Sequence, residues 1–180
     1  MNWLVVAAAA LQLLDLNGRP VDPFQTTADT KAVVFLFTAT DCPISNRYAP
    51  EVQRLYREFA SKGVRFWLVY PNPSEGADAI RIHEKSFGYP ADALRDPKQQ
   101  LVKLAKATVT PEAAVFVITP RGGRLVYHGR IDDRIVDLGL ERPAPTVHDL
   151  DEALTAVIAG KPVARPVTQA VGCFIADFAR

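Results

Sequence analysis

The sequence predicts an α/β domain in which short buried strands alternate with amphipathic helices. Two runs at 32–37 and 64–70 are almost wholly apolar, β-branched or aromatic, and they have the length of buried strands. Between them, at 43–61, apolar residues recur at helical spacing. A third apolar run, at 113–118, follows another helical segment. This alternation over 180 residues fits one α/β domain with small additions.

The composition is ordinary for a folded chain, and the net charge bears on which classes of partner the protein can bind. Apolar residues make up 48% and charged residues 23% of the sequence, and the net charge is +1. This charge gives no electrostatic basis for binding nucleic acid. Two cysteines are too few for a disulfide scaffold, but they are the number that one redox pair needs.

The first residues leave two interpretations open. An apolar run from Trp3 ends in Ala8–Ala10, which has the small-residue pattern of a signal-peptide cleavage site. No lysine or arginine precedes the run, and it is far too short to span a bilayer, so we expect no stable membrane insertion. Residues 1–11 are a candidate signal peptide of a periplasmic or secreted protein, or an extra N-terminal strand of a cytoplasmic one.

A hairpin is expected next. Leu11–Leu16 has the pattern of a strand, Asn17-Gly18 that of a turn, and Pro20–Phe24 that of the returning strand. A polar loop then leads into the strand at 32–37.

Cys42 stands where the strand at 32–37 gives way to a helix. Pro43 follows it, and proline is favoured at the first helical position, so Cys42 is predicted at or next to the N-cap. A thiolate there faces unpaired backbone N–H groups and the positive end of the helix dipole, which lower the pKa of a cysteine and make it nucleophilic. The alternative is a small buried residue without chemistry.

The helix after Cys42 is predicted to reach about Ser61 and to stop at Gly63. Its inner face is made by four apolar residues at helical spacing, Val52, Leu55, Tyr56 and Phe59, and its outer face by Arg54, Arg57 and Glu58.

The next helix is predicted after the strand at 64–70, with Ser74 as its cap and Glu75 in its first turn. Its inward residues are expected to be Ala79, Ile82, His83 and Phe87. We interpret His83 as a packed or exposed helix residue rather than a metal ligand, because no second histidine lies four residues on.

Two more helices are expected in the second half. A short strand at 94–96 precedes a helix at 97–107 whose inward residues are Leu101, Leu104 and Ala105. The charged segment 128–134 is expected to be a solvated loop. Thr146 and Asp149 resemble a capping pair for a helix at 148–159, whose inner face is Leu150, Leu154, Val157 and Ile158.

The segment around Cys42 resembles the active-site segment of the thioredoxin-like superfamily, where a strand, Trp-Cys-x-x-Cys and a helix follow one another. Cys42 matches the first, nucleophilic cysteine of that motif. Ser45 stands in place of the second cysteine, and Asp41 in place of the tryptophan. Pro50 matches the proline that kinks the family's helix.

A second match lies downstream. Thr110-Pro111, followed by the run at 113–118 and the turn at 121–123, is similar to the family's cis-proline and hairpin. Together the matches cover roughly residues 12–135, and within the superfamily the chain looks closest to the redoxin branch of TlpA-like and AhpC/TSA-like proteins.

The resemblance implies a fold and a reaction. The fold is thioredoxin-like: a central mixed sheet flanked by helices, with an N-terminal hairpin, a domain over 12–160 and a C-terminal tail at 161–180. The reaction is thiol–disulfide exchange at Cys42, without a cofactor. Pro111, if cis, presents the backbone of Thr110 to an extended substrate segment. The implied partners are protein thiols or disulfides, or a small peroxide, and a reducing partner of thioredoxin type.

Thiol–disulfide exchange needs a second thiol to release the mixed disulfide. Ser45 has no thiol, and the other cysteine of the chain, Cys173, lies in the apolar tail. Three outcomes stay open: Cys173 resolves the mixed disulfide, an external thiol does so, or Cys42 does not turn over as a redox centre. Cys173 as a buried residue without chemistry is a further alternative.

A peroxiredoxin-like thiol peroxidase is one alternative function. The proline and threonine that this family places before its cysteine are replaced here by Phe35 and Ala39. Its arginine would have to come from Arg95 or Arg130.

Two other classes are a redox-inactive binding domain, suggested by Ser45, and a copper-binding or assembly module of Sco type. Soft thiolates suit Cu(I), and the copper site would require Cys42 and Cys173 to converge with His128 or His148.

Overall fold

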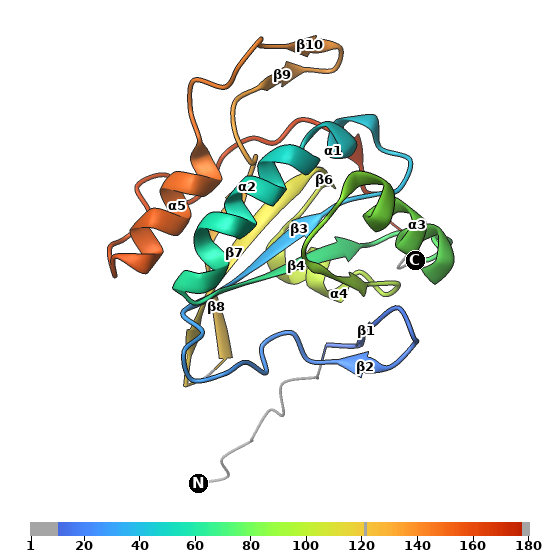
Figure 1. Cartoon of the computed structure of the whole chain (residues 1–180), viewed down its shortest axis with the longest axis horizontal. Helices are drawn as coiled ribbons and strands as arrows, with labels where there is room; N and C mark the ends of the chain where they lie inside the picture. The colour runs from blue at the N-terminus through green and yellow to red at the C-terminus, as the bar shows by residue number, and fades with distance from the viewer. Residues whose placement is uncertain (1–10, 121, 178–180) are drawn as a thin grey trace, which may run out of the picture.

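A mixed β-sheet runs through the centre of the molecule, with helices on both of its faces (Figure 1). The computed structural model describes residues 11–120 and 122–177. Over these residues the sheet has seven strands in the order β2-β1-β5-β4-β3-β7-β8. The strands are β1 Leu13–Leu14, β2 Pro20–Val21, β3 Ala32–Phe37, β4 Val64–Tyr70, β5 Asp92–Arg95, β7 Glu112–Thr119 and β8 Gly122–Gly129.

The strand β3 lies inside the sheet, parallel to β4 and antiparallel to β7. β4 is parallel to β5, and β7 is antiparallel to β8. Every residue of β3 is buried, as its unbroken apolar run predicts. The predicted strands at 32–37, 64–70 and 113–118 are thus confirmed as strands of one sheet, and the strand after the turn at 121–123 completes the expected hairpin.

The N-terminal hairpin is present but shorter than predicted. Leu13 pairs with Val21 and Leu14 with Pro20, and Leu14 also joins the hairpin to Arg95 of β5. Phe24, expected in the returning strand, packs edge-on against the rings of Phe35 and Phe116 instead, because the second face of the sheet needs an apolar cover there.

Alternate residues of β3 supply two cores, one on each face of the sheet. Val34 and Leu36 pack with residues of α2 (Ala49–Phe59), α3 (Ala77–Phe87) and α5 (Asp149–Ile158). Phe35 and Phe37 pack with residues of α4 (Gln100–Ala105). Among the described residues, no helix is both long and apolar enough to cross a membrane.

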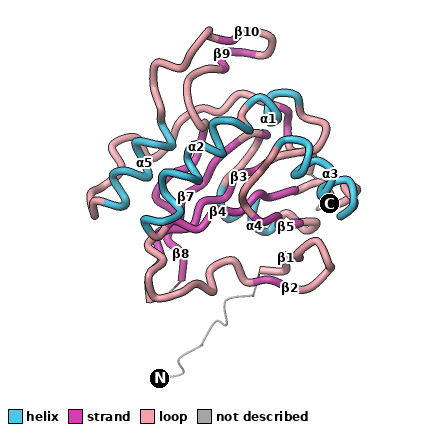
Figure 2. The backbone as a smooth tube through the Cα atoms, in the orientation of Figure 1, coloured by secondary structure: helices cyan, strands magenta, loops and turns pink. Residues whose placement is uncertain are grey.

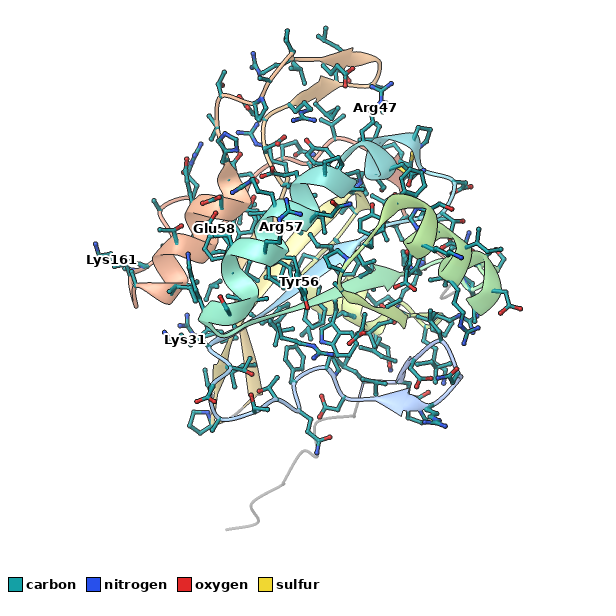
Figure 3. All side chains as sticks on the ribbon, in the orientation of Figure 1. Lys31, Arg47, Tyr56, Arg57, Glu58 and Lys161 are labelled. Atoms are coloured by element: carbon teal, nitrogen blue, oxygen red, sulfur yellow. The ribbon has the colours of Figure 1, made fainter. Side chains whose placement is uncertain are left out.

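The helix predicted after Cys42 is interrupted. It consists of α1 (Pro43–Arg47), α2, and a 3₁₀ turn at Ala60–Lys62 that ends at Gly63 with φ 90°. Pro50 has no N–H to donate, so the α-helical ladder cannot continue unbroken across it. The predicted inner face is confirmed, and Arg57 and Glu58 lie on the exposed surface of α2 (Figure 3).

The start of α3 was predicted wrongly. Its N-cap is Gly76, not Ser74. The backbone N–H and the hydroxyl of Ser74 both donate to Asn72 Oδ1, which forms a turn before the helix. The buried residues of α3 are therefore Ile80 and His83, whereas Ile82 is 67% exposed. Ala79 is also exposed.

The helix α4 is shorter than the predicted 97–107. The buried carboxylate of Asp96 accepts hydrogen bonds from the N–H groups of Gln100, Leu101 and Val102, which sets the start of the helix. Leu101, Val102 and Ala105 are buried, while Leu104, predicted to be inward, is 44% exposed.

The charged segment 128–134 is not a solvated loop. Ile131, Asp132 and Asp133 are buried. Asp133 accepts hydrogen bonds from both the N–H and the hydroxyl of Thr146, so Thr146 does not cap α5. The polar side chains of this segment satisfy backbone groups of a loop that folds over the core.

Most of the chain after β8 is loop, apart from α5 and short strands (Figure 2). An unpredicted hairpin of β9 (Ile135–Asp137) and β10 (Leu140–Glu141) projects beyond α5 (Figure 1). The inner face of α5 is as predicted, with Leu150 and Leu154 fully buried. The interpretation of the first ten residues as a signal peptide or a strand lies outside the described residues.

Candidate active site

Cys42 occupies the turn between β3 and α1. Its backbone is extended, with φ −87° and ψ 106°, and it is the N-cap of α1, with Pro43 in the first turn. The N–H of Ser45 points to Cys42 Sγ at 3.5 Å. The predicted position of Cys42 at the helix start is therefore confirmed, and the N–H groups of the first turn are placed to stabilise a thiolate.

The Cys42 thiol is held in a buried, polar environment. The residue is 1% exposed, and Sγ lies 3.2 Å from Thr110 O and 3.1 Å from Cys173 Sγ. Burial raises the pKa of this thiol, but the dipoles of Ser45 and Thr110 and the Cys173 thiol lower it, so that the pKa lies below its ordinary value. Ser45 Oγ is buried and makes no hydrogen bond in the described structure, so its influence is that of a nearby dipole.

The Thr110–Pro111 peptide bond is cis, as the resemblance implied. The strand before it, β6 (Val109–Thr110), pairs antiparallel with β11 (Cys173–Phe174) in the tail. Cys173 stands opposite Thr110, and Phe174 opposite Val109. The tail thus returns to Cys42 and occupies the backbone edge that the resemblance assigns to an extended substrate.

The two thiols differ in acidity. Cys173 is exposed, yet desolvation and the neighbouring Cys42 raise its pKa to about 11. The charge of Asp41, an exposed residue, contributes to this rise. Cys42 is therefore the thiol of the pair that ionises first.

Glu75 was not predicted as part of this site. It is buried, and its Oε1 accepts the N–H of Thr40 at 2.6 Å, two residues before Cys42. Burial raises the pKa of this carboxyl group, and the Thr40 hydrogen bond only partly offsets the effect. A sequence signal did exist: Cys42 and Glu75 follow the carboxyl ends of neighbouring parallel strands, which meet at one edge of a sheet.

The two arginines that could serve a peroxidase, Arg95 and Arg130, have different surroundings. Arg130 donates from Nε to Asp149 Oδ2 at 2.6 Å and is held in that ion pair. Arg95 lies near enough to Glu75 for its charge to lower the pKa of that carboxyl group. Of the two, Arg95 is therefore the one associated with the Thr40–Cys42 loop.

The copper-site hypothesis does not agree with the geometry. Among the described residues, the cluster of potential metal ligands within 4.8 Å of one another is Glu51, Asp132 and His148, which contains no sulfur. His128 instead faces Glu112, with Nδ1 3.5 Å from Oε1. Cys42 and Cys173 meet without a histidine, so the Cys–Cys–His set that this alternative requires does not form.

Many solved structures resemble the chain, including the following three. An uncharacterized conserved protein from Geobacillus kaustophilus has a TM-score of 0.75 and 25% identity, covering 94% of this chain and 89% of its own. A hypothetical protein from Sinorhizobium meliloti 1021 has a TM-score of 0.72 and 27% identity, covering 91% and 88%. A thioredoxin-like protein from Aeropyrum pernix has a TM-score of 0.57 and 14% identity, covering 82% and 87%. The fold is thus thioredoxin-like.

No curated protein matches the chain at a significant level. The model of the AhpC/TSA family matches residues 6–127, which include β3, Cys42 and the cis-proline. The tail with Cys173 lies beyond the match. Because the match spans more than half of a chain that also has the thioredoxin-like fold, the protein belongs to the AhpC/TSA family.

Proposed function

We propose that the protein is a thiol–disulfide oxidoreductase in which Cys42 is the nucleophile and Cys173 the resolving thiol. The observation that carries this proposal is the 3.1 Å separation of the two sulfur atoms, which come from positions 131 residues apart. A disulfide has an S–S distance of about 2.05 Å, so a small movement joins them. The lower pKa of Cys42 and the raised pKa of Cys173 support the division of roles.

The reaction proceeds by two exchanges. The Cys42 thiolate attacks one sulfur of a substrate disulfide, forming a mixed disulfide and releasing the other substrate sulfur as a thiolate, which takes up a proton. Cys173 then loses its proton and attacks Cys42 Sγ, forming the Cys42–Cys173 disulfide and releasing the second substrate thiolate. The substrate gains two electrons and the protein loses two. An external dithiol of thioredoxin type restores the reduced protein, and the same steps in reverse oxidise a substrate dithiol.

Peptide mapping after mild oxidation with diamide tests the pairing. We expect one intramolecular link between the peptides that contain Cys42 and Cys173. In a turnover assay that follows dithiothreitol-driven reduction of insulin, Cys42→Ser should abolish activity. A stable Cys42 adduct or only intermolecular dimers after oxidation would contradict a resolving role for Cys173, and resolution would then come from an external thiol.

Peroxide reduction is the second candidate, favoured by the burial of Cys42, which a small oxidant overcomes more easily than a protein does. The Cys42 thiolate would attack a peroxide oxygen, giving a sulfenic acid and an alcohol or water. Cys173 would condense with it to the same disulfide and water. Stopped-flow oxidation of the reduced protein by hydrogen peroxide separates the two functions: a peroxidase reacts far faster with peroxide than with a disulfide substrate.

A further inference from the structure

The last described part of the tail lies directly over the nucleophile. Residues 171–177, here called the distal arm, carry Cys173 onto β6 beside Cys42. Cys42 is 1% exposed in this arrangement. Because exchange requires another sulfur to reach Cys42 in line, a protein disulfide cannot react while the distal arm is in place.

The part of the tail before the distal arm is anchored firmly. The N–H of His128 donates to Pro166 O at 3.0 Å, and the N–H of Thr168 donates to His128 O at 3.1 Å. The hydroxyl groups of Thr168 and Tyr127 lie 2.7 Å apart, and Ala170 is buried. These contacts hold the tail to β8 independently of the active site.

The distal arm itself is held by its pairing with β6 and by further hydrogen bonds. The N–H of Ile175 donates to Thr108 O at 3.0 Å, and the side-chain amide of Gln99 donates to Ala176 O at 2.6 Å. Phe174 is 85% exposed, so apolar burial contributes little at that position. Val171 and Ile175 pack on the two cores but are only partly buried. A segment without a fully buried apolar side chain opens locally at a smaller free-energy cost than a core element does.

Gly172 sets how closely the distal arm approaches the site. A Cβ atom built on Gly172 would lie 2.1 Å from Thr110 O, the same carbonyl oxygen that contacts Cys42 Sγ. A residue with a Cβ atom at this position would push the arm and β6 apart, because the Cβ atom would collide with backbone atoms that cannot rotate away.

We propose that the distal arm is a removable cover that regulates access to Cys42 and competes with the substrate for β6. The inference rests on the proposed function. In the open state the β6 edge is free to pair with an extended substrate segment, and Cys42 attacks its disulfide. Closing of the arm then displaces that segment from β6 and brings Cys173 to Cys42 Sγ. Substrate binding and resolution thus alternate at one backbone edge.

The test measures the rate at which iodoacetamide alkylates Cys42, in a Cys173→Ser background so that one thiol reports. Gly172→Ala should lift the distal arm and raise this rate about tenfold. The matched control is Gly76→Ala, where no heavy atom lies within 4 Å of the added Cβ. The control should leave the rate unchanged.

Gln99→Met provides an independent test, because it removes the amide that binds Ala176 O while keeping the length of the side chain. It should also accelerate alkylation, whereas Gln100→Met, next to it in the chain, should not. Thermal unfolding confirms that each variant is folded; if Gly172→Ala does not fold, Gln99→Met decides.

The outcomes separate the two proposals. Equal alkylation rates in folded Gly172→Ala, Gln99→Met and parent proteins would overturn the removable cover and leave the proposed function standing. A Cys42 that stays inert in every variant would overturn the proposed function, and the cover with it.

Discussion

Cys42 and Cys173 have the same side chain, but their surroundings shift its pKa in opposite directions. Around Cys42, the first-turn N–H of Ser45 and the neighbouring polar groups outweigh burial, so the pKa falls. Around Cys173, desolvation and the neighbouring thiol act in the same direction, so the pKa rises. At this scale the difference depends on which atoms lie within about 4 Å of each sulfur.

The two cysteines should therefore react in a fixed order. In reduced protein, iodoacetamide should modify Cys42 at a pH below the ordinary cysteine range, because its lowered pKa gives a larger thiolate fraction. Cys173, with its pKa raised to about 11, should react only at more alkaline pH. Mass spectrometry of the two peptides across a pH series measures both profiles. Equal profiles, or faster modification of Cys173 at neutral pH, would contradict the assignment.

Glu75 should make stability depend on pH. Because burial raises its pKa in the folded state, the folded protein binds this proton more tightly than the unfolded chain does. The free energy of unfolding should therefore decrease as pH rises from the unfolded value of about 4.3 through the folded pKa.

Glu75→Gln keeps an oxygen for the N–H of Thr40 and removes the charge. This variant should be at least as stable as the parent at pH 7, with the difference shrinking toward pH 4, as measured by urea unfolding. Glu58→Gln, an exposed carboxylate on α2, is the control and should not reproduce this pH dependence. A Glu75→Gln variant that is less stable at pH 7 than at pH 4, relative to the parent, would contradict the interpretation.

Among the elements, the joint between α1 and α2 depends on one buried hydrogen bond. The hydroxyl of Tyr48, at the joint, donates to Asp132 Oδ1 at 2.7 Å, and both residues are buried. Burial and the neighbouring carboxylate raise the pKa of Tyr48, so the hydroxyl keeps its proton and remains a donor. This bond ties the helix that carries the active-site turn to the segment 128–134.

Tyr48→Phe should lower the free energy of unfolding by about 1–3 kcal/mol, because it removes a donor from a buried carboxylate. Tyr56→Phe is the matched control: Tyr56 is half-buried on the same helix and packs its ring on Phe66. The control should change stability by less than about 0.5 kcal/mol. Equal effects of the two substitutions in urea unfolding would mean that the Tyr48 hydrogen bond contributes no specific stability.

At the scale of the whole molecule, the tail links the end of the chain to its centre. The two sulfur atoms lie 131 positions apart in sequence and 3.1 Å apart in space. The chain between them includes the strands β4 to β8 and the helices α1 to α5. A bond between the sulfurs would restrict nearly three quarters of the unfolded chain.

Oxidised protein should therefore be more stable than reduced protein. On the chain-entropy model, a disulfide closing a loop of this length stabilises the folded state by about 5 kcal/mol. Thermal unfolding with and without dithiothreitol measures the effect, and it should vanish in both Cys42→Ser and Cys173→Ser. A redox-dependent shift that persists in either variant would contradict its origin in this pair.

The sequence by itself determined the fold and half of the candidate site. Unbroken apolar runs such as 32–37 form interior strands in almost any context, because both faces of the strand must be buried. The Cys42-Pro43 junction is a local signal, since proline restricts the backbone wherever it stands. These features depend on neighbours in sequence, which is why they were predicted correctly, whereas the cis Thr110-Pro111 bond was expected from the resemblance to the thioredoxin-like superfamily.

The tertiary structure decided what depends on distant partners. Ser74 is of a residue type that favours helix N-caps, but it donates its hydrogen bond to Asn72 instead, and the helix begins later. Segment 128–134 had the charge of a solvated loop, yet Thr146, Val147 and Tyr48 satisfy its carboxylates inside the fold. The approach of Cys173 to Cys42 likewise depends on partners that are distant in the sequence. No local pattern specifies which edge the tail will pair with, because that choice depends on the free backbone groups of β6 and on the space that Gly172 leaves beside Thr110.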